Sequence, residues 1–204
     1  MSPRAANLRV EQDGPLRRIA LAAPEKRNTL DAALAEHFLR ELAEAEEDSA
    51  TGAILLEADG PMFCGGLDPA SPPSPDLFSI GRRAVKPMVV AVKGAAVSAG
   101  LALIANAHVA IAAQGCTFGL TDIREGRWND GVLQAVAGAV GQRRALELAL
   151  TGRIFSTAEA AAWGLIHMVA PAFELEDRAT QIATALANAN RDVVHAALSN
   201  SRSA

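Results

Sequence analysis

Two glycine-containing turns are the part of this chain best suited to chemistry. Gly65-Gly66 interrupts the segment MFCGGLD, and a second turn, KGAAVSAG, lies within residues 86–126 between an apolar run and a helix-like stretch. Tight turns of this kind can direct two peptide N–H groups at one oxygen atom. Such a pair of donors stabilises an enolate or an oxyanion, so the two turns indicate carbonyl chemistry.

Carboxylates that could move protons beside such turns follow in the next part of the chain. Asp122, Glu125 and Asp130 all lie in the segment TDIREGRWND. A carboxylate close to a polarised carbonyl compound can take a proton from one carbon and deliver it to another. Asn129-Asp130-Gly131 is also typical of a turn or a helix N-cap, which leaves two interpretations of Asp130 open.

Alternating strands and helices are expected to hold these turns in place. Asp13-Gly14 between two apolar segments predicts a hairpin, and Ser156-Thr157-Ala158-Glu159 predicts a helix start through a capping box. The alternation favours a single α/β core domain, residues 1–187, with at least partly parallel strands and a short C-terminal tail, residues 188–204. The expected strands are 8–12, 16–21, 53–58, 88–92, 109–112 and 166–169, and the expected helices are 28–48, 77–85, 99–107, 141–150, one opening at 156 and 174–187.

The composition excludes several classes of function. The chain has 204 residues, of which half are hydrophobic and 4% aromatic, so its core must be built from small aliphatic side chains. Its net charge of −4 gives no basic surface for nucleic acid, and no apolar run has the length and continuity of a membrane span. Two cysteines and four scattered histidines predict neither a disulfide framework nor a metal site. These features are typical of a cytoplasmic protein.

Several segments resemble the crotonase superfamily, the enoyl-CoA hydratase/isomerase family. They are PEKRN at 24–28, FCGGLD at 63–68, KGAAVSAG at 93–100 and LELALTGRIFSTAEAAAWGLIHMV at 146–169. The resemblance implies a crotonase-type α/β spiral of ββα units with surrounding helices and a shortened C-terminal helical region. It also implies an acyl-CoA thioester as the partner, a role in fatty acid metabolism, and a homo-oligomer, either a trimer or a dimer of trimers.

Carried over residue by residue, the resemblance also implies a set of site residues. The N–H groups of Gly65 and Ala99 are expected to form the oxyanion hole, and Asp122 is expected to be the main acid/base. Asp130 resembles the nucleophilic aspartate that dehalogenases of the superfamily carry in an Asn-Asp pair. No metal or redox cofactor is expected, because coenzyme A arrives as part of the substrate. The residues expected to bind the CoA thioester are Lys26, Arg27, Cys64, Gly66, Leu67, Asp68, Gly100, Phe118 and Trp128.

Departures from the family pattern bear on the reaction. Ala102 stands where the family's hydratases carry one of two glutamates, which leaves Asp122 as the matching carboxylate, and Pro69 replaces a frequent lysine. Ser98 and Ala99 replace two glycines. A site with one acid suits double-bond isomerisation or decarboxylation better than hydration, which needs a positioned water and a proton donor. A CoA-thioester-binding protein with little or no turnover, and a dehalogenase, remain alternatives.

Overall fold

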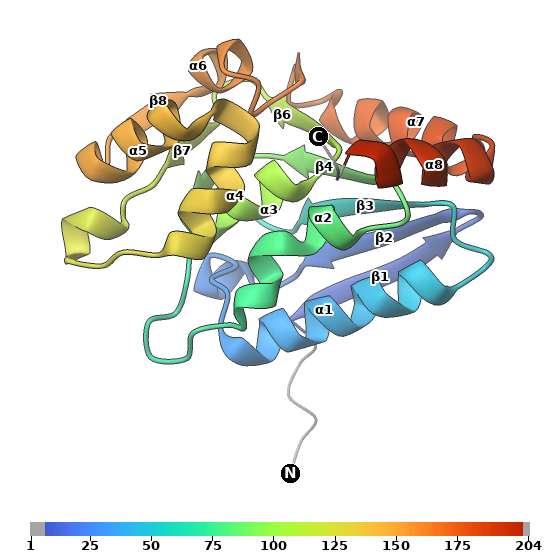
Figure 1. Ribbon diagram of the computed structural model, residues 1–204, viewed down its shortest axis with the longest axis horizontal. Coiled ribbons are helices and arrows are strands. Elements are labelled where there is room, and N and C mark those ends of the chain that lie inside the picture. The colour runs from blue at the N-terminus through green and yellow to red at the C-terminus, as the bar shows by residue number, and fades with distance from the viewer. Residues whose placement is uncertain (1–6, 202–204) are drawn as a thin grey trace.

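A six-stranded sheet forms the centre of the fold, with its strands in the order β1-β2-β3-β4-β6-β9 (Figure 1). The computed structural model describes residues 7–201. β1 and β2 form an antiparallel hairpin, and every later pair of neighbours is parallel. The strands are β1 (Leu8–Asp13), β2 (Leu16–Leu21), β3 (Ala53–Ala58), β4 (Met88–Val92), β6 (Val109–Ala113) and β9 (Met168–Ala170).

A second, three-stranded sheet carries the segments that lead into the turn before α3 and into the segment that contains Asp122. It consists of β5 (Ala95–Val97), β7 (Thr117–Gly119) and β8 (Ile154–Ser156). β5 pairs with β7 in parallel, and β7 pairs with β8 in the antiparallel sense. Phe118 of β7 and Phe155 of β8 are both buried, with their ring centroids 5.5 Å apart, so aromatic packing stabilises this small sheet.

Helices surround the two sheets (Figure 1). Asp31 caps the first α-helix by accepting a hydrogen bond from Leu34 N–H, and Ser156 and Glu159 form the predicted capping box of another. The α-helices are α1 (Ala32–Glu47), α2 (Ile80–Arg83), α3 (Ala99–Asn106), α4 (Asp130–Val140), α5 (Gln142–Thr151), α6 (Thr157–Ala162), α7 (Leu175–Ala187) and α8 (Arg191–Ser201). Three 3₁₀ segments are η1 (Pro24–Lys26), η2 (Pro75–Ser79) and η3 (Asp122–Glu125).

The structure confirms the predicted hairpin, the capping box and the parallel pairing of the central strands. It adds elements that the sequence did not predict, namely β5, β7, β8, α4 and α8. The predicted C-terminal tail, residues 188–204, therefore contains a helix over most of its described part.

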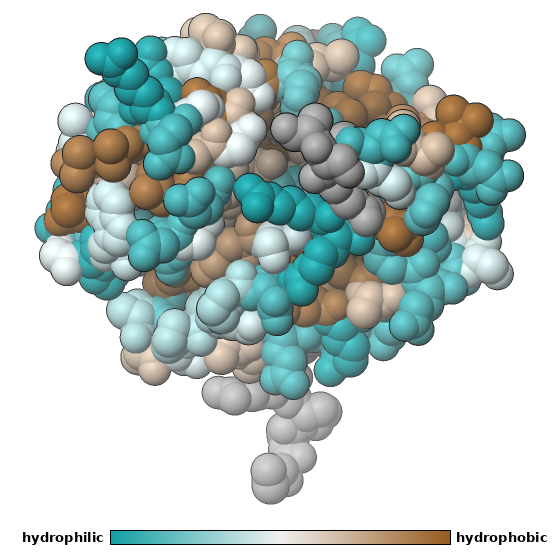
Figure 2. All heavy atoms as spheres, in the orientation of Figure 1, coloured by the Kyte–Doolittle hydropathy of each residue, from teal (hydrophilic) through white to brown (hydrophobic). Residues whose placement is uncertain are grey.

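The core lies between the central sheet and the helices that pack on it. β4 is buried at every position, as expected for a parallel strand covered on both faces. α3 is buried along nearly its whole length and consists of small and aliphatic residues up to Asn106, whose buried amide is hydrogen-bonded to Gly81, Phe78 and Ala102. Polar side chains cover most of the face in Figure 2, with scattered apolar ones between them. No helix within residues 7–201 has both the length and the apolar character needed to cross a membrane.

Gly94, which links β4 to β5, provides a test of this packing. Its φ is +69°, and a Cβ atom there would lie 1.8 Å from the carbonyl oxygen of Pro61. Gly94→Ala should therefore lower the free energy of unfolding by at least about 2 kcal/mol, measured by urea denaturation. Gly138→Ala is the matched control, because that position in α4 has open space around it. The free energy of unfolding of this variant should rise by up to about 1 kcal/mol. Equal unfolding midpoints for the two variants would contradict the close approach at Gly94.

Candidate active site

The first turn of the site follows β3 and includes Gly65. Its N–H donates a hydrogen bond to the carbonyl oxygen of Arg27 at 2.8 Å. A side chain at Gly65 would meet the Cβ and carbonyl oxygen of Arg27 at 3.1 Å, so the two segments are in direct contact. The prediction that Gly65 N–H lines the oxyanion hole is therefore wrong, because this group already has a partner within the protein.

Two N–H groups of this turn, those of Gly66 and Leu67, donate no hydrogen bond within residues 7–201, and the orientation of Leu67 N–H follows from the pairing of this segment. Leu67 lies in a parallel bridge with Leu30, in which Leu30 N–H donates to Gly66 O and Asp68 N–H donates to Leu30 O, both at 2.9 Å. In such a bridge the N–H of the central residue points away from the partner segment. Within the part of the chain that the structure describes, Leu67 N–H has no hydrogen-bond partner.

The second turn joins β5 to α3 and presents the N–H of Ala99. Ser98 N–H donates to Gly119 O at 2.9 Å, whereas Ala99 is the first helical residue and its N–H finds no acceptor among residues 7–201. A helix N-terminus carries positive potential, which favours a negative oxygen at this place. This part of the predicted site fits the geometry: Ala99 N–H is available.

The two turns lie against each other. A Cβ atom on Gly66 would be 3.4 Å from Ser98 Cβ, and one on Gly100 would be 2.9 Å from Cys64 Cβ. Glycine at position 100 therefore lets the start of α3 approach the first turn. Consequently the peptide that carries Leu67 N–H and the peptide that carries Ala99 N–H belong to adjoining segments, as a two-donor oxyanion site requires.

Asp122, the first residue of η3, is a carboxylate that the fold brings back toward these turns. The pairing of β7 with β5 brings the chain back beside the second turn, and Asp122 follows β7 after two residues. Its side chain is 14% exposed, accepts no hydrogen bond from the described residues, and has one oxygen 4.0 Å from Arg127 Nε. Asp122 lines a hollow of about 300 Å³ together with Leu67, Asp68, Pro69, Pro72, Arg127, Trp128 and Asn129.

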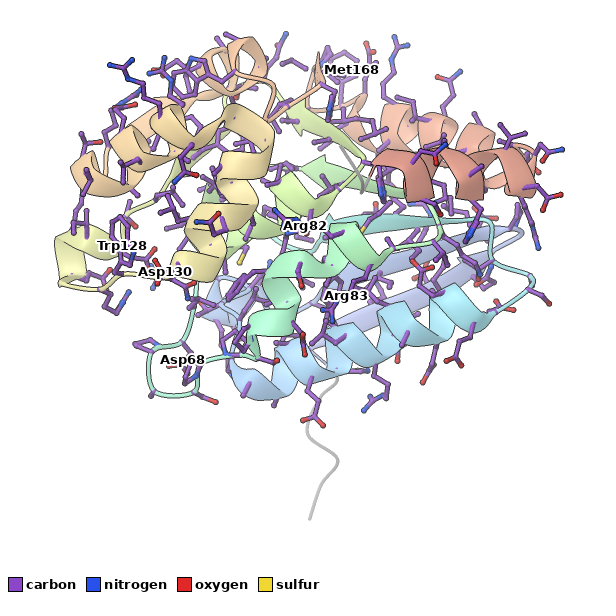
Figure 3. The ribbon with its side chains drawn as sticks, viewed as in Figure 1. Asp68, Arg82, Arg83, Trp128, Asp130 and Met168 are labelled. Carbon is purple, nitrogen blue, oxygen red and sulfur yellow. The ribbon has the colours of Figure 1, made fainter. Side chains whose placement is uncertain are left out.

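Asp68, Trp128 and Asp130 border the same region from two segments (Figure 3). Asp68 accepts a hydrogen bond from Ala70 N–H at 2.9 Å, which holds the loop in shape. Trp128 Nε1 donates to Asp130 at 2.8 Å, and Asn129 caps α4 by accepting from Val132 N–H at 3.0 Å. Asp130 is exposed and is not among the residues that line the hollow, and the Asn129 cap supports the N-cap interpretation of this segment.

Two residues predicted to bind substrate lie in the core instead. Phe118 is fully buried against Phe155 in the small sheet. Cys64 is fully buried behind the first turn, and burial raises the pKa of its thiol to about 12, so it stays protonated and unreactive. Neither side chain lines the hollow, which corrects their predicted roles. Gly66 and Gly100 contribute backbone contacts between the turns rather than side-chain contacts.

Lys26 and Arg27 are exposed at the edge of the first turn. Arg27 has a left-handed backbone, with φ +56°, and its carbonyl oxygen receives the Gly65 N–H. The two cationic side chains lie outside the hollow, at a surface position open to a phosphorylated ligand. Their role in binding coenzyme A remains a prediction.

Asn28, the last residue of the PEKRN segment, is a structural residue of the site. It is fully buried with φ +52°. Its Oδ1 accepts from Ala23 N–H, and its Nδ2 donates to the carbonyl oxygens of Asp59 and Met62 at 3.0 and 2.9 Å. The signal that could have revealed it is an asparagine directly after a short turn, because asparagine adopts left-handed backbone more readily than most residues.

Ala102 is fully buried in the first turns of α3. The Ala102 N–H donates to Ser98 O at 3.4 Å, which places Ala102 one helical turn after the residue that precedes Ala99. The methyl group supplies neither an acid nor a base. Of the eight residues that line the hollow, the carboxylates are Asp68, which holds its own loop, and Asp122.

This fold and these turns define a protein of the crotonase type, and comparison with known proteins agrees. The model of the enoyl-CoA hydratase/isomerase family matches residues 11–204, so the chain belongs to this family. It is 30% identical over 206 residues to the mitochondrial enoyl-CoA hydratase domain-containing protein 3 of Rattus norvegicus, covering 94% of this chain and 68% of the relative.

Further relatives extend this result. A mevalonyl-coenzyme A hydratase of Aspergillus fumigatus is 29% identical over 196 residues, which cover 86% of this chain and 70% of the relative. The crystal structure of a probable enoyl-CoA hydratase/isomerase from Mycobacterium abscessus superposes with a TM-score of 0.89 at 30% identity, covering 96% of this chain and 81% of that one. The comparisons thereby show the fold and the family, which is a family of acyl-CoA-processing enzymes.

Ser98 offers a test of the second turn. Its φ is +49°, its side chain is buried, and its Oγ has no hydrogen-bond partner among residues 7–201. Both features destabilise the fold, so Ser98→Gly should raise the free energy of unfolding by about 1–3 kcal/mol. Ser98→Ala keeps the Cβ atom and removes only the hydroxyl, so its gain should be smaller. Urea denaturation of both variants checks the order, and a destabilised glycine variant would contradict it.

Proposed function

We propose that this protein converts an acyl-CoA thioester through an enolate that the N–H groups of Leu67 and Ala99 hold. The observation that carries the proposal is a pair of N–H groups on adjoining turns that have no hydrogen-bond partner among residues 7–201, together with a hollow that both Leu67 and Asp122 line. Preorganised donors of this kind stabilise negative charge as it develops, and each contributes on the order of 2.7–4 kcal/mol in the transition state.

In the proposed reaction, the thioester oxygen accepts hydrogen bonds from both N–H groups. The two donors make the carbon next to the carbonyl more acidic, because they stabilise the enolate that remains when its proton leaves. Asp122 takes that proton as the C–H bond breaks, and the electron pair moves into the enolate. Asp122 then returns the proton to a carbon further along the acyl chain, which moves the double bond and restores the carboxylate.

Isomerisation fits this arrangement better than hydration. Hydration needs one group to position water and another to deliver a proton, and Ala102 can do neither. Because Asp130 is bound to Trp128 outside the hollow, a dehalogenase mechanism with Asp130 as nucleophile has no support from the geometry. A CoA-thioester-binding protein without turnover is the second candidate, because the site has one carboxylate for proton transfer where the family's hydratases have two.

The remaining features of the proposal concern ligand and context. Lys26 and Arg27, exposed beside the first turn, are proposed to meet the phosphates of coenzyme A. The reaction uses no metal or redox cofactor, since the donors and Asp122 supply the chemistry. A homo-oligomer, a cytoplasmic location and a role in fatty acid metabolism remain proposals that rest on composition and family resemblance.

Asp122→Asn tests the acid/base role directly. The substitution keeps the size and polarity of the side chain but removes its ability to accept a proton. We expect kcat for double-bond isomerisation to fall by about 10²- to 10⁴-fold, while the Kd for a saturated acyl-CoA changes by less than about threefold. Asp130→Asn is the control and should retain turnover, because the amide oxygen can still accept the Trp128 hydrogen bond. A large loss in the Asp130 variant alone would favour the dehalogenase alternative.

Products formed in heavy-oxygen water separate the candidate reactions. A panel of enoyl-CoA thioesters is incubated with the protein and analysed by mass spectrometry. Unlabelled product with a shifted double bond supports the proposal. Product that contains the heavy oxygen would establish hydration and overturn the isomerase assignment. Binding of the thioesters with no turnover of any would support the binding protein.

A further inference from the structure

The hollow beside Asp122 contains a single positive charge. Of the eight residues that line it, Asp68 and Asp122 are acidic and Arg127 is basic. Asp68 is engaged with the backbone of its own loop, and Asp122 has the acid/base role proposed above. Arg127 has no part in that proton transfer, so its presence in the hollow needs another explanation.

The Arg127 guanidinium lies between two carboxylates but is saturated by neither. Its Nη2 is 2.6 Å from Glu125, and its Nε is 4.0 Å from Asp122. A guanidinium has five N–H donors, which leaves others for a ligand. The Arg127 side chain is 37% exposed, so a molecule that enters the hollow can reach it.

The contact with Glu125 leaves Arg127 available to a substrate. Glu125 is 59% exposed and does not line the hollow. An ion pair on the surface contributes little, because water screens it. Water screens the attraction between Arg127 and a carboxylate less when that carboxylate is bound inside the hollow. Such a carboxylate can therefore replace Glu125 as the partner of Arg127.

The rest of the lining indicates what lies between the thioester and such a carboxylate. Leu67, Pro69, Pro72 and Trp128 offer apolar surface to a short hydrocarbon chain. The planar guanidinium matches a carboxylate in a bidentate manner. A doubly charged phosphate fits less well, because Asp122, 4.0 Å from Arg127 Nε, repels a double negative charge more strongly than a single one.

From this arrangement we infer that Arg127 selects an acyl group that ends in a carboxylate, that is, the CoA thioester of a short dicarboxylic acid. The inference rests on the proposed function, because it places the thioester at Leu67 and Ala99. In this arrangement Arg127 binds the distal carboxylate, Asp122 stays free to move the proton, and the chain between them lies on the apolar part of the hollow.

Binding of two saturated thioesters tests the inference without any need for turnover. Glutaryl-CoA carries a terminal carboxylate, and butyryl-CoA has a similar short chain without one. Isothermal titration of the wild-type chain should give a Kd about 10- to 100-fold lower for glutaryl-CoA. In Arg127→Gln this preference should disappear, through a weaker affinity for glutaryl-CoA.

Arg124→Gln is the matched control, because it removes the same charge from η3 at an exposed position outside the hollow. It should keep the wild-type preference. Equal affinities of the wild-type chain for the two thioesters would overturn the inference. So would an Arg127→Gln variant whose affinities for both thioesters fall by the same factor, because that result would mean that Arg127 binds the coenzyme A moiety. If wild type binds neither thioester, the proposed function itself fails. Preference for butyryl-CoA with normal isomerase activity would overturn only the role of Arg127.

Discussion

The buried side-chain amide of Asn28 is the interaction on which the geometry of the site depends. It joins the segment after β2 to the loop after β3 through three hydrogen bonds, to Ala23, Asp59 and Met62. Buried polar groups without partners destabilise a fold strongly, so these bonds fix the two segments relative to each other. The adjacent carbonyl of Arg27 then takes the N–H of Gly65. This contact orients the peptides of Gly66 and Leu67, which follow in the first turn.

One consequence is the choice of donor in the first turn. Because Gly65 N–H points to Arg27 and the neighbours of Leu67 pair with Leu30, Leu67 N–H points away from Leu30 and stays free among the described residues. The donor is therefore selected by hydrogen bonds to residues about forty positions earlier in the chain. The side chain of Leu67 does not determine it, and a substitution that keeps the backbone in place would keep the donor.

The elements predicted correctly from the sequence are those with a long or chemically distinct signal. β3 and β4 are apolar runs, and α1 has apolar residues at helical spacing behind its Asp31 cap. The strands of the second sheet have three residues each, too few for an alternating pattern, and they exist because distant segments pair. α4 was missed because its glycine and valine residues give a weak helix signal.

The candidate site divides in the same way. Asp122 and the helix entrance at Ala99 could be located from local sequence, because a resemblance to family motifs fixes their positions. The error at Gly65 arose because sequence identifies the turn but not which of its N–H groups already has an acceptor. The core positions of Phe118 and Cys64 likewise depend on packing against β8 and α3, which lie far away in the chain.

The physical properties of the second turn indicate why so few side chains are needed for the chemistry. Ser98 combines a left-handed backbone with a buried hydroxyl that has no partner in the described chain, and the next peptide presents Ala99 N–H. Strained backbone persists where the surrounding structure fixes it, and here the Ser98–Gly119 hydrogen bond and the contact with Gly66 do so. Since the proposed donors to the thioester oxygen are backbone groups, alanine at position 102 leaves both of them in place. In the proposed reaction, alanine at position 102 affects the proton transfer, which is assigned to Asp122 alone.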